Sequence, residues 1–282
     1  MFNKLRNFLS KKNSIVYVDC ESKLNEVLED LLLETIIGVD TEFDWRNTYY
    51  PNLCLIQIST NKKIFLIDCL KLNCLVKFKN IFESKKVIKV FHAIRSDITV
   101  LSCYADLNFL NCFDIQISEK FLSGEDPKSY GKIVRKYLSL EIDKSETNSN
   151  WTRRPFTEKQ INYAANDVRF LIKIYKKQKR ILEKKNAYSI VKDLTNKEVS
   201  LGSQKLHISR LKKLKFYKKI EKDLFMWREN IAIEKNVPPS YIFKDKYFKK
   251  ILKILIENTS NDNIYDILKN EKLADNLIES LK

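Results

Sequence analysis

The stretch Ile36-Ile37-Gly38-Val39-Asp40-Thr41-Glu42-Phe43 decides the fold, because an apolar β-branched run leads directly into two carboxylates. It predicts a β-strand in which alternation sends Asp40 and Glu42 to one face and Val39 and Thr41 to the other. Two like charges about 6 to 7 Å apart are costly on a buried strand unless cations neutralise them. A strand that runs out into a polar loop gives the same pattern, so the rest of the chain must decide.

Length and composition indicate an ordinary folded domain plus a smaller one. The chain has 282 residues, of which 44% are apolar and 31% charged, so disorder is not expected. Its formal net charge is +16 and its pI about 9.4, which points to a polyanion partner, either nucleic acid or an anionic membrane. Residues 171–220 alone hold 16 Lys and Arg against three Asp and Glu. A solvated helix face and a track for a polyanion both explain this concentration.

The cysteines and the apolar runs indicate in which cellular compartment the protein is expected. No cysteine pair has C-x-x-C spacing, so we expect buried free thiols and a reducing cytoplasm (Cys20, Cys54, Cys69, Cys74, Cys103 and Cys112). No apolar run approaches the roughly 18 residues of a membrane span, so no membrane association is expected. The basic start, Met1 to Arg6, lacks a long apolar segment, which argues against secretion and leaves a mitochondrial presequence open.

Hydrophobic periodicity predicts a mixed α/β sheet. We expect strands at 36–42, 53–58, 64–68 and 87–91, and the first three, joined by short connections, favour an antiparallel meander. Helices are expected at 22–34, 70–83, 95–104, 114–122 and 129–138. Only four glycines occur and they do not cluster, which excludes a P-loop and a dinucleotide fingerprint.

A second informative helix begins near Thr157. Thr157-Glu158-Lys159-Gln160 has the pattern of a capping box, and the apolar stripe behind it continues to Tyr175. Tyr163 and Asp167 lie one turn apart on an adjoining face. An ordinary hydrogen-bonded pair and a catalytic pair both fit this spacing.

The remainder of the chain predicts a boundary and a small all-α domain. We expect a first domain over residues 1–190, a linker at 191–209 and a helical domain over 210–282. Short helices are expected there at 244–257, 264–269 and 273–281.

The chain thus offers four acids and a tyrosine from separate elements. Asp97 follows the strand at 87–91 and falls on the first turn of a helix, where the macrodipole favours a carboxylate. If Asp97 and Asp167 converge on Asp40 and Glu42, divalent cations are needed to stabilise them. Oxygen ligands select Mg²⁺ or Mn²⁺ over zinc, and two such ions about 4 Å apart serve hydrolysis of a phosphodiester.

At these positions the sequence resembles the ribonuclease D family. Asp40-Thr41-Glu42-Phe43, followed by Thr48-Tyr49-Tyr50-Pro51 and Leu53-Cys54-Leu55-Ile56-Gln57-Ile58, resembles its first exonuclease motif. His92-Ala93 with Asp97 resembles the second motif, and Tyr163-Ala164-Ala165-Asn166-Asp167 the third. Phe113-Asp114-Ile115-Gln116 and Trp151-Thr152-Arg153-Arg154-Pro155 also match, so the resemblance spans about residues 20–185.

The resemblance implies a ribonuclease-H-like fold and two-metal 3′→5′ exonuclease activity. It implies that Asp40, Glu42 and Asp167 bind one Mg²⁺ or Mn²⁺, and that Asp40 and, through water, Asp97 hold another. Tyr163 would orient the attacking water. The Tyr-x-x-x-Asp spacing marks the tyrosine branch of the superfamily, since Asn162 stands where the histidine branch needs His.

The C-terminal part resembles an HRDC domain, a helical nucleic-acid-binding module. Leu224-Phe225-Met226-Trp227-Arg228-Glu229, Val237-Pro238-Pro239 and Ile242-Phe243-Lys244-Asp245 carry this resemblance.

Together these features predict a monomeric, cytoplasmic 3′→5′ exoribonuclease that trims RNA 3′ ends such as those of tRNA precursors. A DNA 3′→5′ exonuclease and a catalytically inactive nucleic-acid-binding protein stay open as alternatives. We further expect nucleic-acid contacts from seven residues, namely Thr41, Phe43, His92, Arg153, Arg154, Lys176 and Lys177.

Overall fold

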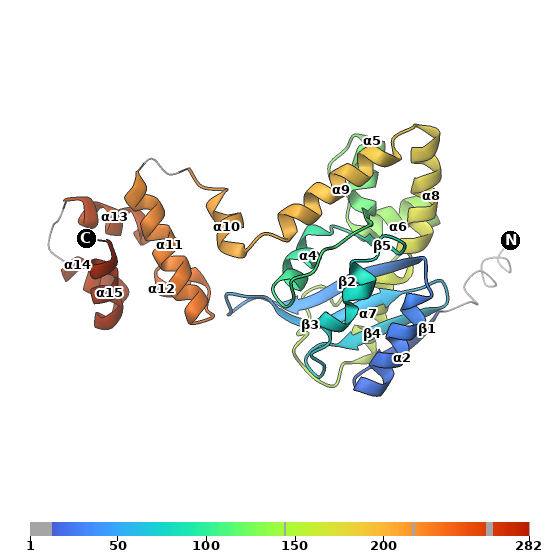
Figure 1. Ribbon diagram of the computed structural model, residues 1–282, viewed down its shortest axis with the longest axis horizontal. Coiled ribbons are helices and arrows are strands. Elements are labelled where there is room, and N and C mark those ends of the chain that lie inside the picture. Colours follow the sequence, from blue (N-terminus) through green and yellow to red (C-terminus); the bar gives the residue numbers. More distant parts are fainter. Residues whose placement is uncertain (1–12, 144, 216–217, 258–261, 282) are drawn as a thin grey trace. The chain divides into compact units, whose positions relative to one another are not determined.

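The computed structural model describes residues 13–143, 145–215, 218–257 and 262–281, so the basic start of the chain lies outside the described residues. The chain divides into two compact units (Figure 1). An α/β unit runs to Asp44 and resumes from Leu53 to Ser203, and a helical unit comprises Trp45–Asn52 and the residues from Gln204 onward.

The α/β unit is built on a six-stranded mixed sheet with the order β1-β4-β3-β2-β5-β6. Strand β1 runs parallel to β4, β2 and β6 run parallel to β5, and β3 pairs antiparallel with β4. The predicted mixed sheet is therefore confirmed. The strands are β1 (Ser14–Val18), β2 (Ile36–Asp44), β3 (Asn52–Ser59), β4 (Lys63–Asp68), β5 (Ile88–Phe91) and β6 (Cys112–Asp114).

Helices cover both faces of this sheet. They are α2 (Glu21–Leu32), η1 (Leu75–Phe78), α3 (Lys79–Phe82), α4 (Arg95–Ser102), α5 (Ile115–Ser123), α6 (Tyr130–Leu138), α7 (Glu158–Arg169), α8 (Leu171–Lys184) and α9 (Tyr188–Gly202). Ile37 and Val39 of β2 enter one core with α2, α3 and α4, whereas Ile36 enters the other core with α6, α7 and α8. Alternation along β2 therefore turns Gly38, Asp40 and Glu42 toward the α7 and α8 layer.

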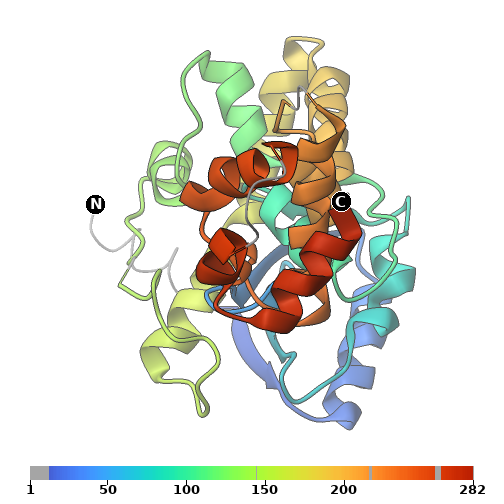
Figure 2. The ribbon, with the colours of Figure 1, turned by 90° about the vertical axis from the view of Figure 1, so that its left-hand side faces the viewer.

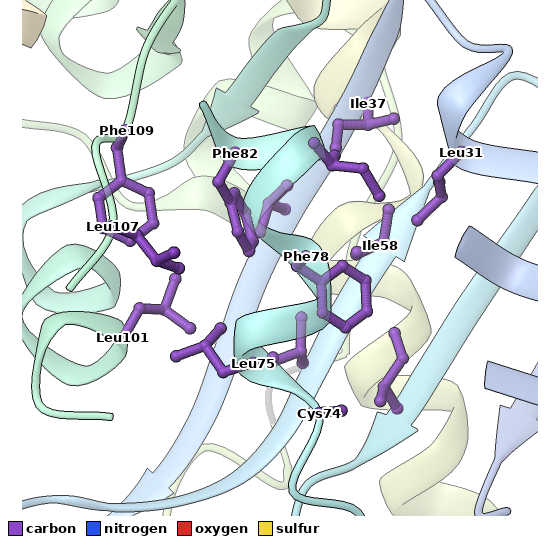
Figure 3. Close-up of a cluster of buried hydrophobic side chains, with 14 of the residues drawn as sticks. Leu31, Ile37, Ile58, Cys74, Leu75, Phe78, Phe82, Leu101, Leu107 and Phe109 are labelled. Atoms are coloured by element: carbon purple, nitrogen blue, oxygen red, sulfur yellow. The ribbon is translucent and has the colours of Figure 1, made fainter. Parts of the chain in front are cut away.

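The first core is closed by aromatic side chains from the segment between β4 and β5 (Figure 3). Phe78 and Phe82 lie with ring centroids 5.9 Å apart, and Phe82 lies 5.3 Å from Phe109. Together with Ile37 and Ile58 from the strands, they bury the side of β2 that carries no acid.

The structure differs from the expected elements in the segment after β4. The predicted helix over 70–83 is wrong, because only Leu75–Phe82 is helical, residues 69–71 form a turn and residues 72–74 have no regular structure. The backbone carbonyl of Asp68 accepts from the N–H groups of Lys71 and Leu72, and its side chain accepts from that of Leu70. This side-chain bond stabilises a turn after Asp68, so the helical segment begins only at Leu75.

Two short strands were not expected from the sequence. β1 pairs at the edge of the sheet with β4, and β6, only three residues long, pairs at the opposite edge with β5. Short edge strands depend on their partner more than on their own periodicity.

The stretch expected as a linker, 191–209, is largely helical. Residues 188–202 form α9, whose Val191 packs in one core and whose Val199 packs in the other. Helix α9 lies against β6 and belongs to the α/β unit up to Ser203. The polar composition that suggested a boundary belongs to the outer face of this helix.

The helical unit contains α10 (Leu206–Leu211), α11 (Lys219–Glu234), α12 (Pro239–Ile242), η2 (Asp245–Tyr247), α13 (Phe248–Glu257), α14 (Asp262–Leu268) and α15 (Glu271–Leu281). Figure 2 draws its helices α13 to α15 in red. Segment 45–52, expected to be a turn of the first domain, is also part of this unit. Buried Tyr49 donates to buried Glu229 over 2.5 Å, and Glu229 also accepts from Arg210 over 3.0 Å.

Candidate active site

Close to the acidic end of β2, the opposing helices come near the sheet. A Cβ on Gly38 would lie 2.5 Å from Ser59 Oγ and 3.0 Å from Leu171 Cβ. Glycine therefore lets the junction of α7 and α8 come against β2, two residues before Asp40. Ser59 Oγ in turn donates to the carbonyl of Val168 over 2.8 Å.

Asp97 is held beside β2 by Thr41, whose side chain lies on the face of the strand opposite to Asp40 and Glu42. It lies in the first turn of α4, is only 3% exposed, and accepts a hydrogen bond of 2.6 Å from Thr41 Oγ1. Burial, and after it the charge of Asp40, raise the pKa of Asp97. The second motif and the first are thus joined directly.

The start of α4 is itself fixed by Asp114, a residue that motif spacing alone does not reveal. Asp114 caps α5 and accepts from the N–H groups of Gln116 and Ile117. It also accepts from the N–H groups of Ala93 and Ile94 at 3.2 and 2.9 Å. Ala93 adopts a φ of 59°, so this carboxylate stabilises a left-handed turn that leads into the helix of Asp97.

Helix α7 carries the other two candidates. Its predicted capping box is present, with Thr157 accepting from the N–H of Gln160 while Gln160 accepts from that of Thr157. Tyr163 and Asp167 follow on one face of the helix. The Tyr163 hydroxyl lies 3.3 Å from Thr147 Oγ1, and its ring centroid lies 6.0 Å from that of Trp151.

The charges of the candidate acids act on one another and on Tyr163. Burial and the charges of Asp40, Asp167 and Asp97 hold the pKa of Glu42 well above its usual value. Burial raises the pKa of Asp40 to about 7, and burial with the charge of Asp40 raises the pKa of Asp167 to about 9. Burial, the charge of Asp40 and other nearby groups raise the pKa of Asp97 as well.

The same environment keeps the Tyr163 phenol protonated. Burial comes first and the charges of Asp167, Glu42 and Asp40 add to it, so the pKa of Tyr163 is raised further above neutrality. The phenol can therefore donate or accept a hydrogen bond but does not supply a phenolate.

The carboxyl groups of Asp40, Glu42, Asp97 and Asp167 are the kind of ligand that hard divalent cations prefer. Four carboxyl groups whose ionisation is suppressed by burial and by one another are the environment that Mg²⁺ or Mn²⁺ would stabilise. In their present positions, no three His, Cys, Asp or Glu side chains among the described residues form a ready metal cage. Asp97 accepts from Thr41 instead, so the side chains would have to rearrange to bind an ion.

The seven expected nucleic-acid contacts fall into different environments. Thr41 is buried against Asp97, Phe43 packs on the first core, and His92 Nε2 lies 3.0 Å from the carbonyl of Lys128. Burial lowers the pKa of His92, so its ring is neutral at pH 7.

The four cationic members of this set also differ from one another. Arg154 is engaged inside the unit, donating to Asp68 through Nε at 2.6 Å and Nη2 at 2.7 Å. Arg153 is exposed, while Lys176 and Lys177, also exposed, donate to Asn61 Oδ1 and the carbonyl of Tyr137.

A family model described as 3′-5′ exonuclease matches residues 15–183. The chain belongs to the 3′–5′ exonuclease family. A second model, described as HRDC domain, matches residues 218–261 of this family member. Both resemblances inferred from the sequence are confirmed.

The chain is similar to curated ribonuclease D proteins. It is 31% identical over 245 residues to ribonuclease D of Desulfotalea psychrophila, covering 82% of this chain and 64% of that protein. It is 29% identical over 276 residues to ribonuclease D of Haemophilus influenzae, covering 90% and 69% respectively. The chain spans about two thirds of the length of these relatives.

Solved structures confirm the fold. Escherichia coli RNase D, described as an exoribonuclease involved in structured RNA processing, has a TM-score of 0.82 at 22% identity, covering 95% of this chain and 74% of that one. The catalytic core of RRP6 from Trypanosoma brucei has a TM-score of 0.68 at 24% identity, covering 95% and 78%. Trypanosoma brucei RNase D in complex with RNA U12 has a TM-score of 0.61 at 21% identity, covering 68% and 72%. Within the described ranges, no helix has the length and apolarity to cross a membrane.

Proposed function

We propose that this exonuclease-family chain removes nucleotides from RNA 3′ ends, with tRNA precursors as substrates. The observation that carries the proposal is the gathering of Asp40, Glu42, Asp97, Tyr163 and Asp167 from β2, α4 and α7 around one point of the sheet. The ribonuclease D relatives and the RNA complex of Trypanosoma brucei RNase D favour RNA over DNA as the substrate.

The four carboxylates would hold two divalent cations, Mg²⁺ or Mn²⁺. By the family pattern, Asp40, Glu42 and Asp167 would hold one, and Asp40 and Asp97, the latter through water, would hold the other. When bound, such cations neutralise the carboxylates and favour the charge that develops on a phosphodiester during hydrolysis.

The chain's own residues would position the reactants. Thr41 fixes the carboxylate of Asp97, and Asp114 fixes the turn that precedes it. Because burial and nearby acids keep its phenol protonated, Tyr163 would orient a water molecule through its hydroxyl rather than act as a base. Arg153, Lys176 and Lys177 are exposed cations that would contact phosphates of the substrate.

A time course on labelled 3′ ends tests this function. A tRNA precursor and a single-stranded DNA of matched length would be incubated with Mg²⁺ or Mn²⁺, and with chelator as the control. The proposal expects stepwise loss of 3′ nucleotides from the RNA, abolished by the chelator. Preferential shortening of the DNA would support a DNA exonuclease, and binding without hydrolysis would support an inactive nucleic-acid-binding protein.

A further inference from the structure

The helix that carries Tyr163 and Asp167 is interrupted three residues after Asp167. The spacing of the apolar stripe predicted one helix from Thr157 to Tyr175, but α7 ends at Arg169 and α8 begins at Leu171. Phe170 lies between them with φ −109° and ψ −5°. In an unbroken α-helix, the N–H of Phe170 would donate to the carbonyl of Asn166.

The hydroxyl of Tyr130 occupies that place in the ladder. Tyr130 Oη donates to the carbonyl of Asn166 over 3.1 Å and accepts from the N–H of Phe170 over 3.2 Å. One hydroxyl can serve as donor and acceptor at once, so both backbone groups are satisfied through a side chain of α6. A side chain inserted into the i→i−4 ladder is a known cause of helix breaks.

Other contacts secure the same break from the sheet side. Ser59 Oγ donates to the carbonyl of Val168, and the missing side chain of Gly38 admits Leu171 against β2. Helix α7 packs on β4 and β2, whereas α8 packs on β2 and β5. The change of direction at Phe170 therefore lets both helices lie on the sheet, with Asp167 in the last turn of α7.

Tyr130 is also electrostatically close to the active site. Burial, together with the charges of Asp167 and Asp40, holds the pKa of its phenol well above the usual value. The hydroxyl consequently keeps its proton and can continue to donate to Asn166. Its ring packs on that of His92 with centroids 5.6 Å apart, a contact that phenylalanine would retain.

We propose that Tyr130 is a positioning residue, whose inserted hydroxyl keeps the α7–α8 break and thereby places Asp167 opposite Asp40. The inference rests on the proposed function and adds to it a residue outside the five candidates. Without the hydroxyl, the N–H of Phe170 and the carbonyl of Asn166 can pair with each other. The last turn of α7 would then straighten and carry Asp167 away from its place.

The test compares Tyr130→Phe with wild type, and with Tyr137→Phe as the matched control. Tyr137 lies on the same helix, and its hydroxyl donates to Glu119 over 2.8 Å, away from the break. In Tyr130→Phe we expect kcat on a short RNA to fall roughly 10- to 100-fold with little change in KM. The dissociation constant for Mn²⁺, measured by calorimetry without RNA, should rise about 10-fold.

Thermal unfolding separates this role from a merely structural one. Because the two backbone groups can pair directly in Tyr130→Phe, its midpoint should equal or exceed that of wild type, and amide exchange at Phe170 should stay slow. A lowered midpoint with unchanged kcat and Mn²⁺ affinity would overturn the inference, and so would wild-type behaviour throughout. If wild type hydrolyses no RNA, the proposed function fails, while the Mn²⁺ dissociation constant of Tyr130→Phe still decides the role of Tyr130.

Discussion

Thr41 Oγ1 donates a hydrogen bond of 2.6 Å to Asp97 Oδ1, joining residues 56 positions apart in the sequence. Thr41 lies between Asp40 and Glu42 but faces the opposite side of β2, where α4 packs. Strand β2 therefore carries Asp40 and Glu42 on one face, and Thr41 on its other face binds the third acid, Asp97. This contact explains why the residue between the acids is a hydroxyl-bearing one that is only 6% exposed.

Replacing Thr41 with valine removes this hydroxyl while keeping the side-chain shape. Asp97 then loses a donor in a buried place, so we expect the hydrolysis rate to fall about 10-fold or more. Thr41→Ser keeps the hydroxyl and should retain most of the activity. Single-turnover rates on a 3′-labelled RNA measure both variants, and equal rates for Val and wild type would contradict the role given to Thr41.

Tyr163→Phe should slow hydrolysis without weakening metal binding. The phenol lies near the acids but is expected to orient water rather than bind an ion, so roughly a 10- to 100-fold loss of kcat is expected. Tyr188→Phe is a suitable control, because it removes a hydroxyl that pairs with Tyr175 in the core. A wild-type kcat in Tyr163→Phe would remove the tyrosine from the mechanism.

The acidic cluster makes stability depend on pH in a definite direction. In the folded chain the pKa values of Asp40 and Asp167 are raised from 3.8 to about 7 and about 9, mainly by burial. The unfolded chain releases these protons at lower pH than the folded chain. The free energy of unfolding should therefore fall as pH rises from about 4 toward 9.

Urea unfolding in chelator at pH 5.5 and pH 8.5 measures this effect. Wild type should be less stable at pH 8.5, by more than about 1 kcal/mol from this cluster. Asp40→Asn should shrink the difference, and Mg²⁺ should shrink it in wild type. If Asp40→Asn leaves the pH dependence unchanged, the carboxyl does not titrate as described.

Segment 45–52 should depend on the helical unit for its order. Asn236 Oδ1 accepts from the N–H groups of Tyr49 and Tyr50 at 3.1 and 3.2 Å, in addition to the bond between Tyr49 and Glu229. Glu229→Ala leaves the Tyr49 hydroxyl and Arg210 without their buried acceptor, and we expect a cost of about 2 kcal/mol.

Hydrogen exchange over residues 45–52 reports this dependence directly, and it should accelerate in Glu229→Ala. Asp223→Asn is the matched control on the same helix, because it breaks an ion pair with Lys219 whose side chains are 37% and 91% exposed respectively, and it should change stability by less than about 0.5 kcal/mol. Unchanged exchange of Tyr49 and Tyr50 in Glu229→Ala would argue against the assignment of the segment to this unit.

Local patterns predicted the elements whose periodicity is complete within one segment. The β2 run, the capping box of α7 and the last two helices, α14 and α15, follow from spacing that the sequence states directly. The five candidate residues could be proposed because they match the motifs of the resembled family residue by residue. Their roles as metal ligands and catalytic groups stay predictions.

The parts that could not be predicted depend on contacts between distant segments. The break at Phe170 is caused by Tyr130, 40 residues away, and nothing in the apolar stripe of α7 and α8 marks it. The turn at residues 69–71 depends on Asp68, whose side chain also accepts hydrogen bonds from Arg154 and Tyr17. Strand β1 did carry a signal, the β-branched run Ile15-Val16-Tyr17-Val18, that pattern reading could have used.

The most direct test of the central claim is the hydrolysis of a 3′-labelled RNA by Asp40→Asn beside wild type, in Mg²⁺ or Mn²⁺. Asp40 is the acid shared by both proposed ions, so its neutral isostere should abolish release of labelled nucleotide while leaving RNA binding largely intact. Release at the wild-type rate from Asp40→Asn, or from wild type in chelator, would contradict the proposed metal-dependent site.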